Sequence, residues 1–599
     1  MYYNPLDVFY KSHTGAVPFN KRLTIRVKGN FDSVVLLVQK DGETIDNRID
    51  MLKDGDVFMC DIMLPIGLYF YCFDLGSGYF LGQNNNMQGE ITSTPTRFQL
   101  SIFDSEFSVP SWLGGGIIYQ IFPDRFNRVN KNSSVSSDKI LHDNWDDMPI
   151  YEPNEKGQVV NNDFFGGDLQ GIIEKLPYLE ELGVSVIYLN PIFKAFSNHR
   201  YDTGDYMQID ELLGTAEDFK LLIKKANEHG IKIILDGVFN HTGDDSVYFN
   251  KYGKYDSIGA YNSKESKYYD WYNFKSYPND YEAWWGIKVL PAVNESNADY
   301  VDFITGKNGV IEHYTKMGIG GWRLDVVDEL PSSFVRNIRS AVKRNNKDAV
   351  LIGEVWEDAS NKIAYGVRRE YFLGKELDSV MNYPLKNAII NFVRNGDAKV
   401  LSFTVKEQID HYPESVLNSL MNILSTHDTC RLITSLCGSD MSGKSKAEMS
   451  KTFISENDLA AAINKVKIAS LLQFTLCGVP CIYYGDEAGM QGYIDPLNRR
   501  TYPWGKENKE LISWYKFLGN IRKEYSCFAG GKFKEVYADN GAFIFERIDE
   551  NAELLIAVNL SKEPLSLSFD GVLTDLISNK EFDGGVDLKE NDYMILLKK

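Results

Sequence analysis

Carboxylates, an arginine and histidines recur in four short segments of the sequence, each beside an apolar, β-branched run. A single carboxylate at the end of a strand is usually structural, but several that follow successive strands of a barrel can meet at one site. The segments therefore predict one active site assembled from several strands. They are DGVFNH (236–241), GWRLDVVDE (321–329), GEVW (353–356) and STHD (425–428), and they contribute Asp325, Glu354, Asp428, Arg323, His241 and His427.

The residue types in these segments suit acid–base and nucleophilic chemistry. Arg323 and Asp325 are two apart in an expected strand, so their side chains share a face. A guanidinium favours the ionised form of a neighbouring carboxyl group, as a carboxylate nucleophile requires, although such a pair taken alone is more often structural. Glu354 follows an apolar run, a setting in which a general acid can keep its proton. An acid and a nucleophile of this kind are the groups that glycoside hydrolysis uses.

Apolar runs alternate with amphipathic stretches from residue 111 onward, a pattern typical of a parallel sheet. Eight strands are expected, the number that closes a (β/α)8 barrel. A capping box at Thr215 and Asp218 and a stop at Gly230 bound one connecting helix. The expected strands are 116–122, 184–192, 232–239, 320–327, 349–356, 379–385, 420–428 and 479–487.

The fold class that we expect is multidomain α/β, with four units along the chain. Residues 1–110 read as an N-terminal β-sandwich, because short β-branched runs alternate there with Asp-Gly turns. The catalytic (β/α)8 TIM barrel takes 111–241 and 303–522. Residues 242–302, rich in Tyr, Trp, Asn and Ser, form an insert after the third strand. Residues 523–599 return to short strands and predict a C-terminal β-sandwich.

Composition limits the classes of partner. The net charge of −19 disfavours nucleic acid and acidic membrane surfaces, whereas a neutral substrate is compatible with it. No apolar run is long enough to cross a membrane, and the first residues lack the pattern of a secretory signal. The seven cysteines are scattered without a CxxC spacing. These features predict a cytoplasmic protein with no membrane partner.

Together the four segments resemble the conserved regions of the α-amylase family, glycoside hydrolase family 13, in the same order along the barrel. The resemblance implies that Asp325 is the nucleophile, Glu354 the acid/base and Asp428 the third carboxylate, which supports distortion of the sugar. It implies that Arg323, His241 and His427 line the sugar beside the scissile bond. The segment HRYDTGDY (199–206) also resembles the family, with His199 as a ligand of sugar hydroxyls and Tyr201 as a stacking ring.

The N-terminal module and the segment LPAVNES (290–296) are similar to the neopullulanase, cyclomaltodextrinase and maltogenic amylase group. In that group Trp356 would lie on the leaving-group side, and Asp495 and Arg499 would hold more distant sugars on the other side. The N-terminal module, which is carbohydrate-binding-like, would also mediate a homodimer. The expected substrates are neutral α-glucans: cyclodextrins, pullulan, maltooligosaccharides and starch, cleaved at α-1,4 bonds with retention and with transglycosylation as a further outcome.

Calcium is the one cofactor that the resemblance to the family suggests. Some relatives bind it in a loop after the first strand together with a Gly-Gly-Asp sequence, which is present here as 166–168. The loop FNRVNKNSS (126–134) carries Arg128 where an oxygen ligand would be expected. We therefore expect no tight calcium site and no other metal.

Two alternative functions stay open on the sequence. One is another α-glucan-active or trehalose-related member of the same family, such as a branched-dextrin enzyme. The other is a non-catalytic barrel used for binding. The presence of Asp325, Glu354 and Asp428 argues against the second, because binding relatives typically lose these carboxylates.

Overall fold

The computed structural model describes residues 2–130, 136–155 and 157–598. Its centre is an eight-stranded parallel sheet in the order β24-β21-β20-β17-β14-β11-β26-β25. A parallel bridge between Met381 and Met421 joins the two outer strands, so the sheet closes as a barrel. The (β/α)8 fold is thus confirmed. The strands are β11 (Ile118–Ile121), β14 (Val186–Leu189), β17 (Lys232–Gly237), β20 (Gly321–Leu324), β21 (Val350–Gly353), β24 (Ser379–Val380), β25 (Met421–Ile423) and β26 (Val479–Tyr483).

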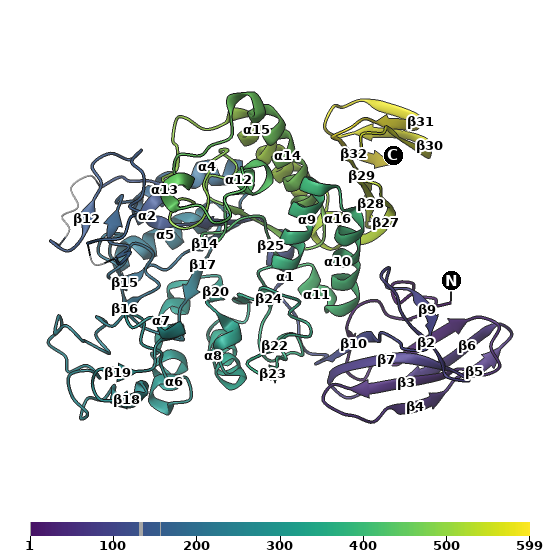
Figure 1. The fold of residues 1–599 in the computed structure, drawn as a ribbon, viewed down its shortest axis with the longest axis horizontal. Helices are drawn as coiled ribbons and strands as arrows, with labels where there is room; N and C mark the ends of the chain where they lie inside the picture. The colour runs from purple at the N-terminus through teal and green to yellow at the C-terminus, as the bar shows by residue number, and fades with distance from the viewer. Residues whose placement is uncertain (1, 131–135, 156, 599) are drawn as a thin grey trace.

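The barrel strands are short and almost wholly buried, as strands covered on both faces must be. Helices such as α5 (Ala216–Glu228), α8 (Ser332–Asn345), α9 (Tyr383–Asn395) and α14 (Glu456–Thr475) surround them (Figure 1). In α5 the predicted capping box of Thr215 and Asp218 is present, and one apolar face of the helix is buried. That face comprises Phe219, Leu222, Ile223 and Ala226.

One expected strand is much shorter than its apolar run. Residues 379–385 predicted a strand, but β24 covers only Ser379–Val380 and α9 begins at Tyr383. The Asn382 side chain accepts a hydrogen bond from the Leu385 amide and caps the helix, and a proline occupies its first turn. Both features favour the start of a helix over continued strand.

Two β-rich regions flank the barrel on the right of Figure 1. The N-terminal region pairs a seven-stranded sheet, which includes β3 (Val35–Lys40), β7 (Gly67–Gly76) and β10 (Phe98–Phe103), with a three-stranded sheet around β6 (Val57–Ile62). The C-terminal region is a six-stranded antiparallel sheet from β27 (Lys532–Asp539) to β32 (Asp592–Lys598). In β28 (Ala542–Ile548), Phe543 and Phe545 face the barrel core while Ile544 faces a separate core.

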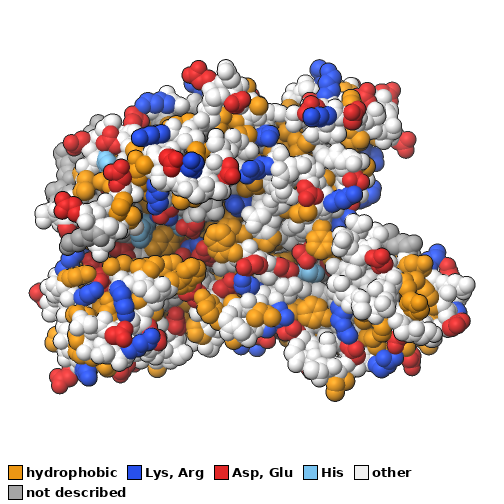
Figure 2. All heavy atoms as spheres, viewed as in Figure 1, with side chains coloured by type: hydrophobic (Ala, Val, Ile, Leu, Met, Phe, Trp, Pro, Cys, Tyr) orange, Lys and Arg blue, Asp and Glu red, His pale blue; other side chains and the backbone are white. Residues whose placement is uncertain are grey.

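The long connection between β17 and β20 carries small elements before its two helices. These are β18 (Phe274–Ser276), β19 (Asp280–Tyr281) and the 3-10 turn η2 (Trp284–Gly286), followed by α6 (Ala298–Thr305) and α7 (Val310–Met317). In Figure 1 this insert lies at the lower left. Figure 2 shows the same face hollowed between the insert and the part of the barrel above it. The residue boundaries predicted for the four units stay predictions.

Among the helices of the described residues, none is long and apolar enough to cross a membrane.

Candidate active site

Arg323 joins three carboxylates at the carboxyl ends of three neighbouring barrel strands. Its Nη1 donates to Asp236 Oδ1 at 2.8 Å and to Asp325 Oδ1 at 2.9 Å. Its Nη2 lies 2.8 Å from Glu354 Oε2, although that contact lacks the alignment of a hydrogen bond. The strand order explains this meeting, because β20 lies between β17 and β21 and Arg323 is in register with Asp236.

Glu354 is fixed by two further donors. The Val326 amide donates to Oε2 at 2.9 Å, and Trp356 Nε1 donates to Oε1 at 3.1 Å. Val326 adopts a left-handed conformation with φ of 38°, which is rare for a β-branched residue and is found mostly at functional sites. Trp356 stacks on Tyr383 at 3.9 Å between ring centroids and keeps 45% of its surface exposed, so it can also meet a ligand.

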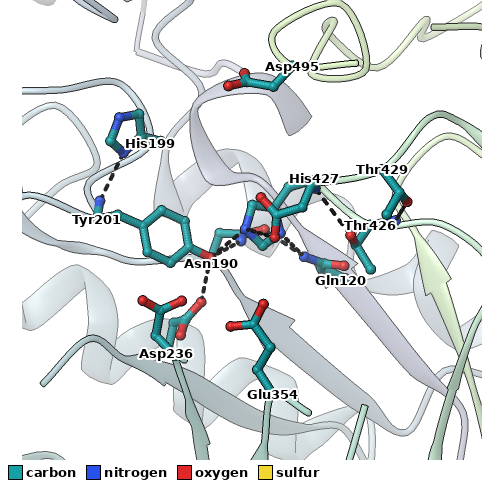
Figure 3. A network of polar contacts seen from close by, with 12 residues as sticks. Gln120, Asn190, His199, Tyr201, Asp236, Glu354, Thr426, His427, Thr429 and Asp495 are labelled. Atoms are coloured by element: carbon teal, nitrogen blue, oxygen red, sulfur yellow. Dashed lines mark hydrogen bonds and ion pairs between the residues drawn. The ribbon is translucent and has the colours of Figure 1, made fainter. Parts of the chain in front are cut away.

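Tyr201 and His427 form a second polar group above the carboxylates (Figure 3). The Tyr201 hydroxyl donates to Asp236 Oδ2 at 2.8 Å and lies 2.7 Å from His427 Nε2. Gln120 Nε2 donates to the other ring nitrogen of His427 at 2.9 Å, which leaves Nε2 as the protonated nitrogen. The two rings are nearly parallel, with 8° between their planes and 5.2 Å between centroids.

His199 and His241 approach Tyr201 from its backbone side. The Tyr201 amide donates to His199 Nδ1 at 3.1 Å, and His241 Nε2 donates to the Tyr201 carbonyl at 3.0 Å. Within the described part of the chain, His241 Nδ1 is buried and has no hydrogen-bond partner. Burial lowers the pKa of His199 to about 3 and that of His241 to about 4, and it holds the pKa of His427 well below its usual value. All three rings are therefore neutral near pH 7, ready to donate or accept hydrogen bonds.

Asp428 lies at the more open side of the site with Arg499 and Asp495. Arg499 Nη2 is 3.4 Å from Asp428 Oδ1, and its Nη1 is 2.9 Å from Asp495 Oδ1. Arg499 Nε also donates to the His427 carbonyl at 2.9 Å, which fixes the guanidinium beside the loop after β25. In Figure 3, Asp495 lies apart from Asp236 and Glu354, on the loop after β26. The structure thus brings the predicted site residues to one end of the barrel.

The electrostatics correct one expectation from the sequence. We expected Arg323 to favour the ionised form of Asp325, and its charge does act in that direction. Burial is the larger effect, however, and the charges of Glu354 and Asp236 add to it, so the pKa of Asp325 lies well above its usual range. Burial likewise raises the pKa of Asp236 and of Asp428. Because these carboxyl groups lie in one buried cluster, their titrations belong to the cluster and not to any single residue.

Several residues of the network were missed by sequence reasoning. Gln120 and Tyr188 lie within apolar barrel strands, and Asn190 directly follows one; the Tyr188 hydroxyl donates to Asp236 Oδ2 at 2.6 Å. A polar side chain in an otherwise apolar strand was the available indication. Glu329, which ends the second segment, binds two indoles of the insert, a contact between elements that spacing cannot predict.

The described part of the loop 126–134 and the Gly-Gly-Asp sequence at 166–168 do not fit a calcium ion, as expected from Arg128. Arg128 donates to the carbonyls of His142, Asp143 and Phe165 at 3.0, 3.1 and 3.3 Å, so a guanidinium already satisfies these oxygens. Asp168 is also occupied, since its oxygens accept from the amides of Gly171 and Asn130. Residues 131–134 of the predicted loop lie outside the described residues. A fixed cation among the ligand oxygens would repel Ca²⁺.

The comparisons with known proteins agree with this fold. A family model described as the catalytic domain of α-amylase matches residues 120–526, and one described as the β-galactosidase C-terminal domain matches 544–598. Since the first match covers more than half of the chain, the protein belongs to the α-amylase family.

Similar proteins carry several names within this family. An amylopullulanase of Thermoanaerobacter thermohydrosulfuricus is 36% identical over 91% of this chain, which spans only 41% of that protein. A cyclomaltodextrinase of Thermoanaerobacter pseudethanolicus is 34% identical over 76% of this chain and 72% of its own. Among solved structures, the type III pullulan hydrolase from Thermococcus kodakarensis aligns over all of both chains with 26% identity and a TM-score of 0.70.

Proposed function

We propose that the protein is a retaining glycoside hydrolase that cleaves α-1,4-glucosidic bonds in cyclodextrins, pullulan, maltooligosaccharides and starch. The observation that carries this proposal is the contact of one buried guanidinium, Arg323, with Asp325 and Glu354 at the open end of the barrel. Relatives named cyclomaltodextrinase, neopullulanase and amylopullulanase support the substrate range.

In the first step, Asp325 forms a bond to the anomeric carbon while the bond from that carbon to the leaving oxygen breaks. Glu354 gives its proton to the leaving oxygen. In the second step, Glu354 takes a proton from water, and the water oxygen replaces Asp325 at the anomeric carbon. The aligned hydrogen bond from Arg323 Nη1 supports Asp325 as the charged partner, since Nη2 makes no such bond to Glu354. A sugar hydroxyl in place of water gives transglycosylation.

The remaining side chains would bind the sugar around this centre. Asp428 would accept hydrogen bonds from sugar hydroxyls and favour the distorted ring. The neutral rings of His199, His241 and His427 would meet hydroxyls as donors or acceptors, and Tyr201 would offer its ring face. Asp495 and Arg499 would hold sugars further along the same side, and Trp356 would contact the leaving sugar. These roles remain proposals based on position.

A second candidate is hydrolysis of branched or cyclic glucans that contain α-1,6 links. It is favoured by the structural likeness to the cyclic α-maltosyl-(1→6)-maltose hydrolase from Arthrobacter globiformis, with 28% identity and a TM-score of 0.66 over 82% of this chain. A non-catalytic binding role is not supported, because Asp325, Glu354 and Asp428 are all present at the barrel end.

A product profile on α-cyclodextrin, pullulan and soluble starch, measured side by side, tests the proposal. We expect linear maltooligosaccharides from cyclodextrin and trisaccharides that keep their α-1,6 bond from pullulan. Release of maltotriose from pullulan would instead show α-1,6 cleavage and favour the second candidate. Turnover retained in Asp325→Asn, with the fold unchanged by circular dichroism, would overturn the assignment of the nucleophile.

We propose further that the protein is a homodimer in the cytoplasm. A homodimer predicts a solution mass of twice that of the chain in sedimentation equilibrium, and a mass equal to the chain would exclude it. The acidic net charge supports neutral glucans, and not nucleic acid or acidic membranes, as partners. The cytoplasmic compartment rests on the sequence alone.

A further inference from the structure

The loop after β21, which carries Trp356, is tied down at Asp358. Tyr412 Oη donates to Asp358 Oδ1 at 2.7 Å, and His411 Nδ1 donates to Asp358 Oδ2 at 3.0 Å. The same Tyr412 oxygen accepts a hydrogen bond from the Ala359 amide at 3.0 Å. Since Asp358 is only two residues beyond Trp356, the bonds that hold its carboxylate also limit where the indole can lie.

Asp358 and His411 are held as an ion pair. Burial alone would raise the pKa of Asp358, but the pairing with His411 and the hydrogen bonds to the carboxylate outweigh burial, so this pKa lies below its usual value. Burial alone would lower the pKa of His411, and the pairing with Asp358 raises it above its usual value. Both shifts favour the charged forms, so the loop is anchored by charge as well as by hydrogen bonds.

These anchors lie at the end of one helix, α10 (Ala398–His411), which also reaches the second contact of Trp356. Gln408 Nε2 donates to Asn382 Oδ1 at 2.7 Å, and Asn382 Nδ2 donates to Gln408 Oε1 at 3.2 Å. Asn382 caps the helix that begins at Tyr383, the residue on whose ring Trp356 stacks. Helix α10 therefore holds both the loop of Trp356 and the ring against which the indole packs.

The N-terminal region of the same chain binds the next residues of this loop. Gln99, in β10, donates through Nε2 to Ser360 Oγ at 2.9 Å, and its Oε1 accepts from Asn361 Nδ2 at 2.7 Å. The Gln99 side chain is buried, so both ends of its amide need these partners. One amide of the N-terminal region thus clamps two consecutive residues of the loop.

The N-terminal region is itself fixed to the barrel by two ion pairs. Lys11 pairs with Asp410 of α10, and both side chains are fully buried. Further along the connection after β21, Arg368 donates through Nε and Nη2 to the two oxygens of Asp41, each at 2.8 Å. Buried pairs and bidentate pairs both demand one geometry. Gln99 therefore holds the loop from a fixed base.

We propose that Asp358 and Gln99 are positioning residues, through which α10 and the N-terminal region hold Trp356 beside Glu354. The proposal rests on the proposed function, in which Glu354 is the acid/base and Trp356 contacts the leaving sugar. Neither positioning residue touches the substrate. The N-terminal region thereby takes part in catalysis within its own chain, because Gln99, which lies outside the barrel, helps to place the loop of the acid/base.

The first test compares two substrates that differ in their need for Trp356. Maltohexaose has a sugar as its leaving group, whereas fluoride leaves α-maltosyl fluoride without a proton. We expect kcat/KM on maltohexaose to fall about tenfold in Asp358→Ala and about threefold in Gln99→Ala, and kcat/KM on α-maltosyl fluoride to stay unchanged. Asp358→Asn keeps an acceptor for Tyr412 and should recover part of the loss. Gln39→Ala, at a half-buried glutamine of β3, is the matched control and should match the natural protein on both substrates.

A double-mutant cycle tests whether the two residues act through Trp356. If they do, adding Asp358→Ala to Trp356→Ala should change kcat/KM on maltohexaose by less than about twofold, because the indole that Asp358 places is already gone. Adding Gln99→Ala should likewise have little effect. Losses that multiply in the combined variants would show that Asp358 and Gln99 do not act through Trp356, and would overturn the proposal.

Two further results would overturn the positioning roles: an equal loss on both substrates, which is the mark of a general loss of stability, and no loss on maltohexaose. If the unaltered protein cleaves neither substrate, the proposed function fails separately. Hydrogen–deuterium exchange of the peptide 354–361 then still tests the clamp. Exchange should be about tenfold faster in Gln99→Ala and unchanged in Gln39→Ala. Exchange in Gln99→Ala equal to that of the natural protein would contradict the proposal.

Discussion

Arg323 and Asp236 face each other in register on adjacent parallel strands, with Nη1 2.8 Å from Oδ1. The pair is buried, and Tyr188 and Tyr201 donate to the other oxygen of Asp236. Asp236 therefore fixes the guanidinium on one side, and the same nitrogen reaches Asp325 on the other. The position of Asp325 therefore depends on the planar shape of the Arg323 guanidinium as well as on its charge.

Arg323→Lys keeps the positive charge but loses the planar fork, so it should lower kcat/KM about 100-fold. The charge of Arg323 opposes the raised pKa of Asp325, and a lysine ammonium that no longer reaches Asp325 would oppose it less, so Arg323→Lys should raise that pKa further. The reaction needs ionised Asp325, so the acidic limb of the pH profile of kcat/KM should move to higher pH. An acidic limb that stays in place would show that Arg323 does not control Asp325.

Glu354→Gln removes the proposed proton donor while keeping the size of the side chain. Turnover of maltohexaose should fall about 1,000-fold. Fluoride leaves without a proton, so the first step with α-maltosyl fluoride should survive, and azide should restore turnover by replacing water. The measurement is the rate on both substrates with and without azide. Equal losses on both, with no rescue, would contradict the assignment.

Asp202 makes the stability of the fold depend on pH. Burial, together with the charge of Asp245, raises the pKa of Asp202 to about 7 in the folded protein. The folded state therefore binds a proton that the unfolded state has released, and stability falls as pH rises from about 4 to about 7. Asp202→Asn should raise Tm above pH 7 and flatten this dependence. A variant with a lower Tm than the natural protein at about pH 8 would contradict this prediction.

Because Arg128 already binds the carbonyl oxygens of this loop, we predict that the activity and stability of the protein do not depend on calcium. Activity and Tm should be the same with and without EDTA. Arg128→Asn leaves three carbonyl groups without their donor and should lower the free energy of unfolding by about 2 kcal/mol. Arg22→Asn, at a largely exposed arginine, is the control. A large loss of activity with EDTA in the natural protein would show that a metal is bound after all.

The sequence was enough to predict the barrel because its strands are buried on both faces and read as apolar runs. Asp325, Glu354 and Asp428 could be found in the same way, since each comes just after such a run. The residues 379–385 were misread because an apolar run does not distinguish a strand from the first turn of a helix. There Asn382 and the proline after Tyr383 were the stronger local determinants.

Contacts between distant segments could not be predicted. Glu329 meets Trp284 and Trp285 across more than forty residues of chain, and Gln120 reaches His427 from the opposite end of the barrel sequence. Such pairs depend on how the insert and the loops pack. The raised pKa of Asp325 was likewise hidden, because burial outweighs the neighbouring charge that the sequence displays.

The most direct test of the central claim is to trap the covalent intermediate. Glu354→Gln would be mixed with α-maltosyl fluoride, quenched in acid, digested and analysed by peptide mass spectrometry. We predict a maltosyl group on the peptide that contains Asp325, and none when Asp325 is also replaced by Asn. A label on Asp236 or Asp428, or turnover of the fluoride without any labelled peptide, would contradict the account.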